Sequence, residues 1–437
     1  MPDNVYNENG NYIYRLKHSG TAIDSFLSLL YDDQLEEVMY IGERKTVKIF
    51  HRKYGMCDTD FTMKKVEANK IIEQILKSAQ DINASGNIIN TSLADGSRVN
   101  IVRGEIVDGG PIITIRKFKK DSITIIDLLR SKTINIHFAA YMWMCIEGLN
   151  LNPANIIFCG GTSSGKTTIL NAFTVFIPKI SRIITIEDCF ELRLPHPHIV
   201  SLESTNNVPM QSLVKTTLRM RPNRIIIGEV RDKEAQDLFT AMNIGFNGCM
   251  GTLHSNSSRE TISRITNKPM EVPVILLRNL DLIVMQKKKI IDGKTTRYIS
   301  EVSEISGSEG DNPLLNTVFS FNETTNILER TNVPSRTRAK IVSQSGISIM
   351  RFEQILDARK RILSMLTERG DSYKNTELLD VIDQQSKITR EQIATDTNTS
   401  NNTTTNNYSP YEKKEEEKKE DKGVFSKIGS FFEEKMF

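Results

Sequence analysis

The sequence has no paired cysteines, no long apolar run and no excess of charge of one sign. Its five cysteines form no C-x-x-C pair, which argues against both a zinc site and a disulfide framework. No apolar run is long enough to span a bilayer, and the N-terminus lacks the charged-then-apolar pattern of a signal peptide. We therefore expect a cytoplasmic protein whose contact with a membrane is peripheral or made through a partner.

Charge is nearly balanced over the chain. Lysine and arginine number 57, and aspartate and glutamate number 54, so the net charge of +3 gives no argument for nucleic-acid binding. No basic stripe interleaved with aromatic residues is present, which disfavours a DNA-translocating motor, and we expect no nucleic-acid partner. With 437 residues, 38% hydrophobic and 25% charged, the composition is typical of a globular protein of two or three domains.

The chain does contain a phosphate-binding loop of the pattern G-x-x-x-x-G-K-[ST]. Its residues are Gly160, Gly161, Thr162, Ser163, Ser164, Gly165, Lys166 and Thr167. In such a loop the backbone N–H groups curl around a triphosphate, the lysine reaches the β- and γ-phosphates, and the threonine hydroxyl can ligate Mg²⁺. The apolar run 155–159 fits a buried parallel strand, and residues 168–173, beginning with Thr168, fit a helix whose N-terminus faces the anion.

Two carboxylates downstream are candidates for the acid that an NTPase needs near Mg²⁺ and the attacking water. Glu187 follows the strand-like run 182–186, and Glu229 follows the run 224–227. Acids at the carboxyl ends of parallel strands open onto the crevice where such sheets bind ligands. Glu229 is therefore the better candidate for the Walker B acid and Glu187 for a second carboxylate, whereas Asp188 can equally be structural or a helix N-cap.

Histidines add one further candidate. His254 lies in a Gly/Ser-rich segment after the second acid and can serve either as a nucleotide sensor or as an ordinary satisfied polar residue. His196 and His198 have a spacing that metals use, but no cysteine or acidic pair lies near them, so we interpret them as loop residues.

Composition and periodicity divide the chain into six parts. They are a polar segment 1–20, an α/β domain 21–120, a connection 121–137, a nucleotide-binding domain 138–394, a disordered linker 395–423 and an amphipathic end helix 424–437. Alternation of strands and helices from 155 to about 286 predicts a mainly parallel sheet. The other predicted elements are strands at 38–41, 46–50, 111–116 and 295–302, a hairpin within 88–101, and helices at 66–76, 138–149 and 349–366.

The order of these motifs closely resembles the secretion ATPase superfamily of type II secretion, type IV pilus assembly, type IV secretion and the archaellum. Residues 184–188 resemble its Asp box, 218–231 its Walker B region and 248–257 its His box. Three N-terminal segments look most like the archaeal type II secretion or type IV pilus branch: 51–57, 95–100 and 114–118. The resemblance covers residues 35–370 approximately.

The resemblance implies a fold and a set of residue roles. It implies an α/β chain in which a small PAS-like domain precedes a RecA-like P-loop NTPase domain, with ATP bound between the two domains. Lys166 would then contact the phosphates, Glu187 and Glu229 would position Mg²⁺ and the attacking water, and His254 would communicate the nucleotide state. The resemblance also implies that four arginines neutralise charge or form salt bridges: Arg98 and Arg116, which reach the phosphates when the domains close, and Arg219 and Arg231, for which salt bridging is the alternative.

The function implied is a hexameric ATPase that drives pilin-like subunits out of or into the cytoplasmic membrane. Its direct partner would be a polytopic membrane platform protein. The chain lacks the four-cysteine zinc module of many bacterial type II members, and little precedes residue 21, which weakens an archaellum assignment. An archaellum motor, a type IV secretion ATPase and a nucleotide-gated scaffold with little turnover are the alternatives.

Overall fold

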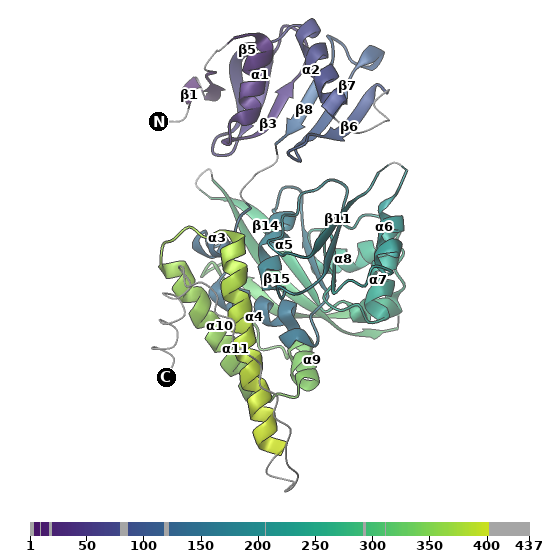
Figure 1. Cartoon of the computed structure of the whole chain (residues 1–437), viewed down its shortest axis with the longest axis vertical. Coiled ribbons are helices and arrows are strands. Elements are labelled where there is room, and N and C mark those ends of the chain that lie inside the picture. Colours follow the sequence, from purple (N-terminus) through teal and green to yellow (C-terminus); the bar gives the residue numbers. More distant parts are fainter. Residues whose placement is uncertain are drawn as a thin grey trace, which may run out of the picture. The chain divides into compact units, whose positions relative to one another are not determined.

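The computed structural model divides the chain into two compact units, Met1–Arg390 and Glu391–Phe437. The residues that it describes are 4–8, 10–16, 20–78, 86–117, 122–205, 207–291, 294–310 and 312–401. The first unit contains two β-sheets (Figure 1). The second unit is described only where the last helix enters it, and the predicted end helix 424–437 lies outside the described residues.

The N-terminal sheet has the strand order β1-β2-β5-β4-β3-β8-β7-β6. Its strands are β1 (Val5–Glu8), β2 (Asn11–Tyr14), β3 (Leu35–Tyr40), β4 (Thr46–His51), β5 (Gly55–Thr62), β6 (Ile88–Ser92), β7 (Arg98–Val102) and β8 (Ile112–Arg116). Alternate side chains, such as Val47 and Ile49 of β4, are buried in a core that includes residues of helices α1 (Ala22–Tyr31) and α2 (Lys65–Ser78). The sheet therefore buries one face under these helices.

The predicted elements of this region are confirmed. The structure has strands over the predicted runs 38–41, 46–50 and 111–116 and a helix over 66–76. β6 and β7 form the predicted antiparallel hairpin, and the Asp95 carboxylate accepts the Ser97 N–H at 2.9 Å in the turn. A short 3-10 helix η1 (Gly104–Ile106) links β7 to β8.

The polar segment 1–20 contains two strands that the sequence did not predict. β1 and β2 pair with each other, and β2 extends the sheet through a parallel pairing with β5. Each has only four residues, in which apolar and aromatic residues follow one another instead of alternating with polar ones, so no alternation marks them as strands. What anchors them is the burial of Tyr14 and Leu16, each 5% exposed.

The connection 121–137 is also more ordered than predicted, because it contains helix α3 (Ile125–Arg130). Thr124 and Asp127 form a capping box at its start, and Ile125 and Ile126 are buried. The Arg130 guanidinium donates to the Leu366, Thr367 and Asp371 carbonyls at the end of α10 (Ile349–Glu368). α3 thus satisfies the carbonyl groups that the end of a helix leaves without partners.

The C-terminal sheet has the order β11-β10-β12-β13-β9-β14-β15-β16-β17, and it is parallel from β11 to β14, as predicted. The parallel strands are β9 (Ile156–Gly160), β10 (Ile183–Glu187), β11 (Ile199–Glu203), β12 (Arg224–Ile227), β13 (Met250–His254) and β14 (Leu282–Ile291). An antiparallel meander completes the sheet with β15 (Lys294–Glu309), β16 (Asn312–Asn322) and β17 (Ile327–Arg330).

Helices cover both faces of the parallel strands, which explains why β9, β10 and β12 are buried at every position. Ile157 and Cys159 of β9 belong to a core shared with α6 (Met210–Thr217), α7 (Glu234–Asn243) and α8 (Ser258–Thr266). Phe158 of β9 points to the other face and stacks on Phe173 of α5 (Lys166–Phe173) with ring centroids 5.8 Å apart. Short 3-10 turns complete this layer: η2 (Gly148–Asn150), η3 (Thr174–Phe176) and η4 (Val274–Asn279).

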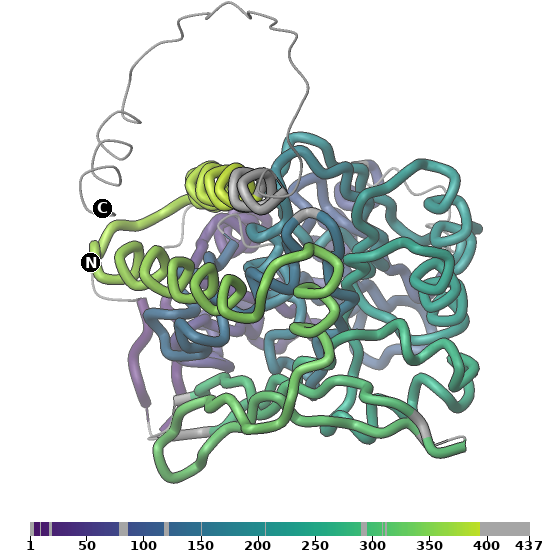
Figure 2. The backbone as a smooth tube through the Cα atoms, turned by 90° about the horizontal axis from the view of Figure 1, so that it is seen from below, coloured from purple at the N-terminus to yellow at the C-terminus, as the bar shows by residue number. Residues whose placement is uncertain are grey.

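Helix α4 (Ile136–Glu147) joins this domain to the C-terminal helices α9 (Arg336–Ser345), α10 and α11 (Asn375–Asn401). A buried ion pair links Glu147 of α4 to Arg359 of α10, and the Arg359 guanidinium lies 4.7 Å from the centroid of the Trp143 ring. Trp143 donates a hydrogen bond to Ser386 of α11 (3.3 Å). Figure 2 shows α10 and α11 on the same side of the C-terminal sheet. α4 and α10 confirm the helices predicted at 138–149 and 349–366.

The predicted linker 395–423 begins inside a helix, because α11 continues to Asn401. Its Asn/Thr-rich sequence lacks apolar residues for a core, but a helix needs only its own backbone hydrogen bonds once it has been started by a packed segment. The remainder of that segment lies outside the described residues.

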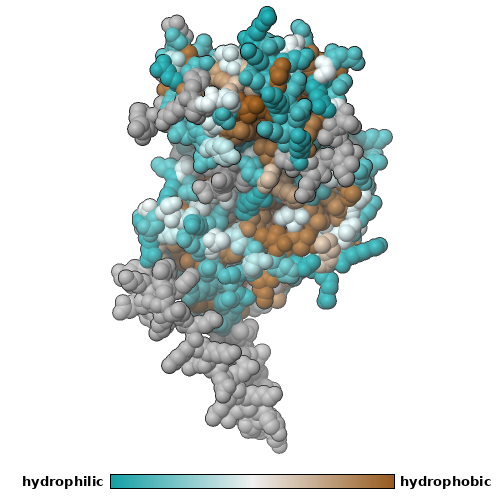
Figure 3. Space-filling view, turned by 45° about the horizontal axis from the view of Figure 1, so that its top comes forward, coloured by the Kyte–Doolittle hydropathy of each residue, from teal (hydrophilic) through white to brown (hydrophobic). Residues whose placement is uncertain are grey.

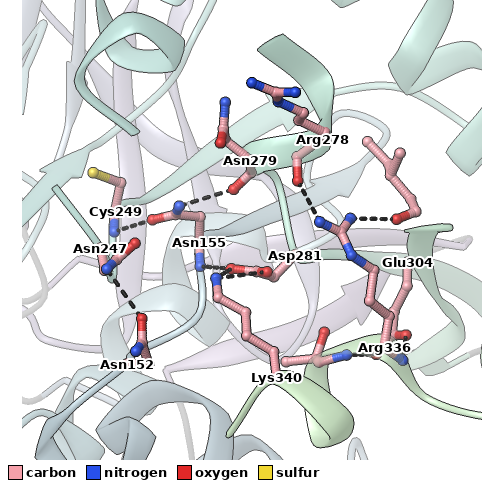
Figure 4. Close-up of polar contacts among 12 residues, drawn as sticks. Asn152, Asn155, Asn247, Cys249, Arg278, Asn279, Asp281, Glu304, Arg336 and Lys340 are labelled. Carbon is pink, nitrogen blue, oxygen red and sulfur yellow. Dashed lines mark hydrogen bonds and ion pairs between the residues drawn. The ribbon is translucent and has the colours of Figure 1, made fainter. Parts of the chain in front are cut away.

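Buried polar side chains hold the edge of the C-terminal sheet where the parallel strands begin (Figure 4). Asn155, just before β9, accepts the Cys249 N–H at 2.9 Å and donates to the Asn279 carbonyl at 2.8 Å. Asp281, just before β14, accepts the Asn155 N–H at 2.9 Å and pairs with Lys340 of α9 at 3.0 Å. We call Asn155, Cys249, Asp281 and Lys340 the base network.

A second carboxylate fastens α9 beside the base network. The buried Glu304 of β15 accepts hydrogen bonds from the Ser335 hydroxyl (2.7 Å) and from the Arg336 N–H (2.6 Å) at the start of the helix. Arg336 donates in turn to the carbonyls of Arg278 (2.9 Å) and Ile305 (2.6 Å). Because the N-terminal turn of a helix favours negative charge, Glu304 stabilises α9 in this position.

The face seen in Figure 3 is largely hydrophilic, with apolar groups gathered near the middle of the view. The most exposed large apolar side chains, Ile180 at 87%, Tyr31 at 84% and Met350 at 71%, belong to separate elements or loops. Scattered exposure of this kind is normal for a folded domain. In the part of the chain that the structure describes, no helix is both long and apolar enough to cross a membrane.

Candidate nucleotide site

The phosphate-binding loop lies between β9 and α5, as the sequence predicts. Gly160 ends the strand, residues 161–165 form the loop, and Lys166, Thr167 and Thr168 form the first turn of the helix. Thr162 and Ser163 are exposed, whereas Ser164 is buried. The loop therefore connects the centre of the sheet to a helix N-terminus, which is where an anion is favoured.

Two glycines in this loop are required by its geometry. Gly165 caps α5 with φ 97°, in the left-handed region that side chains avoid. A Cβ atom on Gly160 would come within 2.4 Å of the Gln286 carbonyl oxygen and 2.5 Å of Ser164 Oγ. Ser163 also has a positive φ of 58°. These angles turn the backbone into the concave loop that cradles phosphate groups.

Lys166 is buried and has partners on the loop and on β13. Its ammonium group donates to the Gly161 carbonyl at 3.2 Å and lies 3.2 Å from His254 Nδ1. Burial lowers the pKa of Lys166, and the negative charge of Glu229 opposes that change. The lysine is thus held inside the loop at the place that the β- and γ-phosphates would occupy.

Glu229, after β12, lies at the centre of a polar chain. Its Oε1 is 3.1 Å from His254 Nε2, and its Oε2 is 2.7 Å from Arg231 Nη2. Arg231 also pairs with Asp188 at 3.1 Å, and Asp188 accepts the Ser204 hydroxyl at 2.9 Å. Arg231 therefore forms salt bridges, the alternative left open for it, and Asp188 is one of its two partners.

The protonation states follow from these contacts. Burial and then the positive charge of Lys166 lower the pKa of His254, so the imidazole is neutral near pH 7. Burial would raise the pKa of Glu229, but the hydrogen bond and charge of Arg231 outweigh it and leave that pKa below its usual value. The neutral ring fits the tautomer that donates from Nε2 to Glu229, and the Lys166 ammonium lies at nearly equal distances from Nδ1 (3.2 Å) and Nε2 (3.3 Å). His254 thus joins the phosphate lysine to the Walker B carboxylate.

Glu187, at the end of β10, is 2% exposed. Its Oε1 accepts the N–H groups of Glu191 and Leu192 at 2.9 Å each, while no partner of Oε2 exists among the described residues. Burial raises the pKa of Glu187 to about 7, against these two backbone hydrogen bonds. Gly228 makes room for it, because a Cβ atom there would lie 2.9 Å from Glu187 Cγ.

These residues fit a nucleotide carrying Mg²⁺. The buried Oε2 of Glu187 and the buried Oγ of Ser164 lack partners within the described ranges, and the loop glycines leave space that a Cβ would fill. No group of three His, Cys, Asp or Glu side chains in those ranges could hold a metal alone. That suits Mg²⁺, which takes one or two protein oxygens and completes its shell with phosphate oxygens and water. Thr167, Glu187 and Glu229 are the candidate ligands.

Arg98 and Arg116 lie on the N-terminal sheet, directly opposite each other in the β7–β8 pairing. Arg98 forms an ion pair with Glu191 (2.9 Å), the residue whose N–H binds Glu187, and Arg116 lies 3.9 Å from Glu36. Arg98 is therefore connected to the site through Glu191. Contact of either arginine with a phosphate remains a prediction.

Arg219 lies away from the phosphate-binding loop and from Glu229. It is exposed in the turn after α6, which leads into the start of β12, whereas Glu229 follows the end of β12. Because the strand separates its two ends, Arg219 lies at the edge of the sheet opposite the phosphate-binding loop.

Two residues next to the loop were missed by sequence analysis. Arg297 of β15 donates from Nε to the Ser163 carbonyl at 3.3 Å, and Gln286 of β14 pairs with Gly160 in the sheet. No motif surrounds either residue. The signal that could have found Gln286 is the topology, since β14 is the neighbour of the loop strand on the side away from β13.

This arrangement defines a P-loop NTPase of the α/β class. The loop follows one parallel strand, β9, and the acid follows another, β12, with β13 between them. The particular family follows from sequence comparison, because the family described as "Type II/IV secretion system protein" matches residues 60–366. The chain belongs to this family.

Known relatives include proteins of both archaea and bacteria. An uncharacterised protein of Methanocaldococcus jannaschii, MJ0781, is 43% identical over 231 residues, 51% of this chain and 32% of its own length. The type IV secretion system protein VirB11 of Brucella suis is 31% identical over 263 residues, 51% of this chain and 72% of its own length. The chain thus spans about a third of the first relative.

One solved structure that aligns with this chain is that of the ATPase DotB of Legionella pneumophila. It is 18% identical, with a TM-score of 0.49, and the alignment covers 80% of this chain and 99% of that one.

Proposed function

We propose that this protein is an ATPase motor that hydrolyses ATP to ADP and phosphate and converts hydrolysis into domain motion. The observation that carries the proposal is the direct contact of Lys166 and Glu229 with one neutral ring, His254. A phosphate cradle alone binds nucleotide, whereas a linked cation, imidazole and carboxylate can respond to the γ-phosphate and to water.

ATP binding would rearrange this cluster. The γ-phosphate is a stronger partner for the Lys166 ammonium than the neutral His254 ring is, so the ring is released when the triphosphate binds. Glu229 then has an oxygen free to orient the attacking water and accept its proton. Mg²⁺, held through Thr167, would neutralise charge on the phosphates. His254 thereby reports the nucleotide state to the carboxylate.

Closure of the N-terminal domain would supply the remaining positive charge. Arg98 and Arg116 are directly opposite each other on neighbouring strands, and like charges in that position repel. A phosphate between them relieves the repulsion and stabilises the transition state. We propose that ATP draws Arg98 away from Glu191 and that this closure is the power stroke.

The proposed setting is a ring of six subunits at the cytoplasmic face of the cell membrane. Its partner would be a polytopic membrane platform protein, and pilin-like subunits would be moved through that partner. A second candidate is a type IV secretion ATPase, favoured by the 31% identity to VirB11. Sizing of the purified protein with and without ATP would test the hexamer, since monomers at micromolar concentration under both conditions would contradict it.

Hydrolysis is tested by measuring phosphate release from Mg-ATP. Lys166→Ala should abolish both ADP binding and turnover, because the loop loses its cation. Glu229→Gln should keep ADP binding and lower turnover about 100-fold, the usual loss when a catalytic polar group is removed. Lys215→Ala, an exposed residue on α6, is the matched control and should behave as wild type. A wild-type protein that stays inactive with lipid and platform protein present would overturn the proposal.

A further inference from the structure

The nucleotide site has a second side that no motif describes. Lys166, His254 and Glu229 lie toward β13 and β12, on one side of the loop strand β9. These residues accompany the γ-phosphate and water. β14 and β15 follow on the other side of β9, and we expect the part of the nucleotide common to ADP and ATP to face them.

Arg297 of β15 lies against the phosphate-binding loop on this second side. Its Nε–H donates to the Ser163 carbonyl at 3.3 Å, and its Cδ and Nε lie 3.2 and 3.5 Å from the position of a Cβ on Gly165. The side chain is exposed, and its two terminal nitrogens have no hydrogen bond or ion pair within the described ranges. One N–H thus fixes the guanidinium beside the loop and leaves four N–H groups for a ligand.

Gln286 lies beneath Arg297 and is 2% exposed. Its side-chain Nε2 is 3.2 Å from the same Cβ position on Gly165, and its Oε1 has no partner in the described parts of the chain. A buried amide oxygen without a partner is costly unless a ligand or water satisfies it. This second observation, independent of the helix N-terminus, also points to a ligand at this place.

Charge supports the same conclusion. Lys288 of β14 is exposed and directly opposite Arg297 in the β14–β15 pairing. Like charges directly opposite each other destabilise a strand pair, and Arg297 also lies beside Gly165 at the positive N-terminal end of α5. A bound anion would offset this repulsion.

We propose that Arg297, supported by Gln286, binds the α-phosphate and ribose side of the nucleotide. This inference rests on the proposed function, since it adds a contact to the same site. An interaction made equally with ADP and ATP contributes to affinity and leaves the chemical step unchanged. Arg297 is therefore a nucleotide-binding residue, distinct from arginines that act on the γ-phosphate.

The test compares Arg297→Gln and Arg297→Lys with wild type, measuring calorimetric Kd for Mg-ADP and steady-state kcat and KM for ATP. Arg297→Gln should weaken ADP binding and raise KM about tenfold, as expected for one charge-assisted hydrogen bond. The kcat value should stay within about twofold, because the lost contact is uniform. The Kd and KM values of Arg297→Lys should lie between those of wild type and Arg297→Gln, because lysine keeps the charge but lacks the planar set of N–H donors.

Lys287→Gln is the matched control, because Lys287 is exposed on the same strand and its side chain points to the opposite face from Lys288. Its Kd should equal that of wild type, and without nucleotide no variant should have a lower thermal midpoint than wild type, because Arg297→Gln removes the repulsion with Lys288. Wild-type affinity in Arg297→Gln overturns the inference, as does a loss confined to kcat. Failure of wild type itself to bind ADP contradicts the proposed function instead.

Discussion

The imidazole ring of His254 lies between Lys166 of the loop and the Glu229 carboxylate. Only part of this arrangement could be predicted from the sequence. The sequence places Lys166 and Glu229 at the ends of separate strands, so their approach follows from parallel topology. The role of His254 stayed open because its chemistry depends on partners 25 and 88 residues away in sequence, as the contacts with Glu229 and Lys166 show.

Residues without a motif could not be found in this way. Arg297 lies 134 residues from Ser163, and nothing near it in sequence marks a nucleotide contact. Glu191 is similar, because its N–H holds Glu187 while its side chain holds Arg98. Such partners are determined by tertiary packing, which local sequence patterns do not reveal.

The burial of one further residue, His196, leads us to expect that the stability of the protein depends on pH. Its Nε2 contacts the Ile177 carbonyl at 2.9 Å, its Nδ1 has no partner in the described part of the chain, and burial lowers its pKa to about 4. Because the unfolded residue titrates near 6.5, the stabilisation is complete above pH 6.5 and is lost as the pH falls toward 4. The loss is about 3 kcal/mol.

Urea unfolding of wild type and His196→Gln between pH 4 and pH 8 checks this expectation. Glutamine keeps a donor for Ile177 and cannot titrate, so the difference between the two free energies of unfolding should shift in favour of the variant below pH 6.5. Parallel curves over the whole range would rule the explanation out.

Among the elements, regular apolar runs were predictable and polar or short ones were not. β10 and β12 are buried at every position, and six of their nine residues are isoleucine, which is typical of parallel strands buried on both faces. β1 and β2 have only four residues each and α3 has only six, so each depends on neighbours supplied by distant segments. Elements that are stabilised mainly by tertiary contacts leave a weak local signal.

The buried pair between α4 and α10 gives a prediction at this scale. Glu147 and Arg359 are 1% and 2% exposed, so removing one partner leaves an uncompensated charge in the core. Arg359→Met should lower the free energy of unfolding by about 3–5 kcal/mol. The double variant Glu147→Met with Arg359→Met should lose less than the single variant, because no unpaired charge remains.

Denaturant titration of the two single variants and the double variant measures the coupling. An additive double variant would show that the pair does not interact and that the α4–α10 contact is purely apolar.

On the scale of the whole molecule, the two domains are proposed to act through Arg98 and Arg116. Arg98→Gln and Arg116→Gln should each lower kcat about 100-fold, because positive charge at the developing transition state is lost. ADP affinity should change little, because ADP lacks the γ-phosphate. Steady-state kinetics with calorimetry of ADP separates the two effects, and an equal loss of kcat and ADP affinity would place these arginines elsewhere on the nucleotide.

The base network connects helix α9 to the strand that carries the phosphate-binding loop. Asn155 and Asp281 fasten the start of the parallel strands to Lys340 of α9, while the end of β9 carries Gly160 and the loop. β9 is five residues long, a span of about 16 Å, and it is buried throughout. We therefore expect β9 to couple displacements of α9 to the phosphate-binding loop, and phosphate release at the loop to α9.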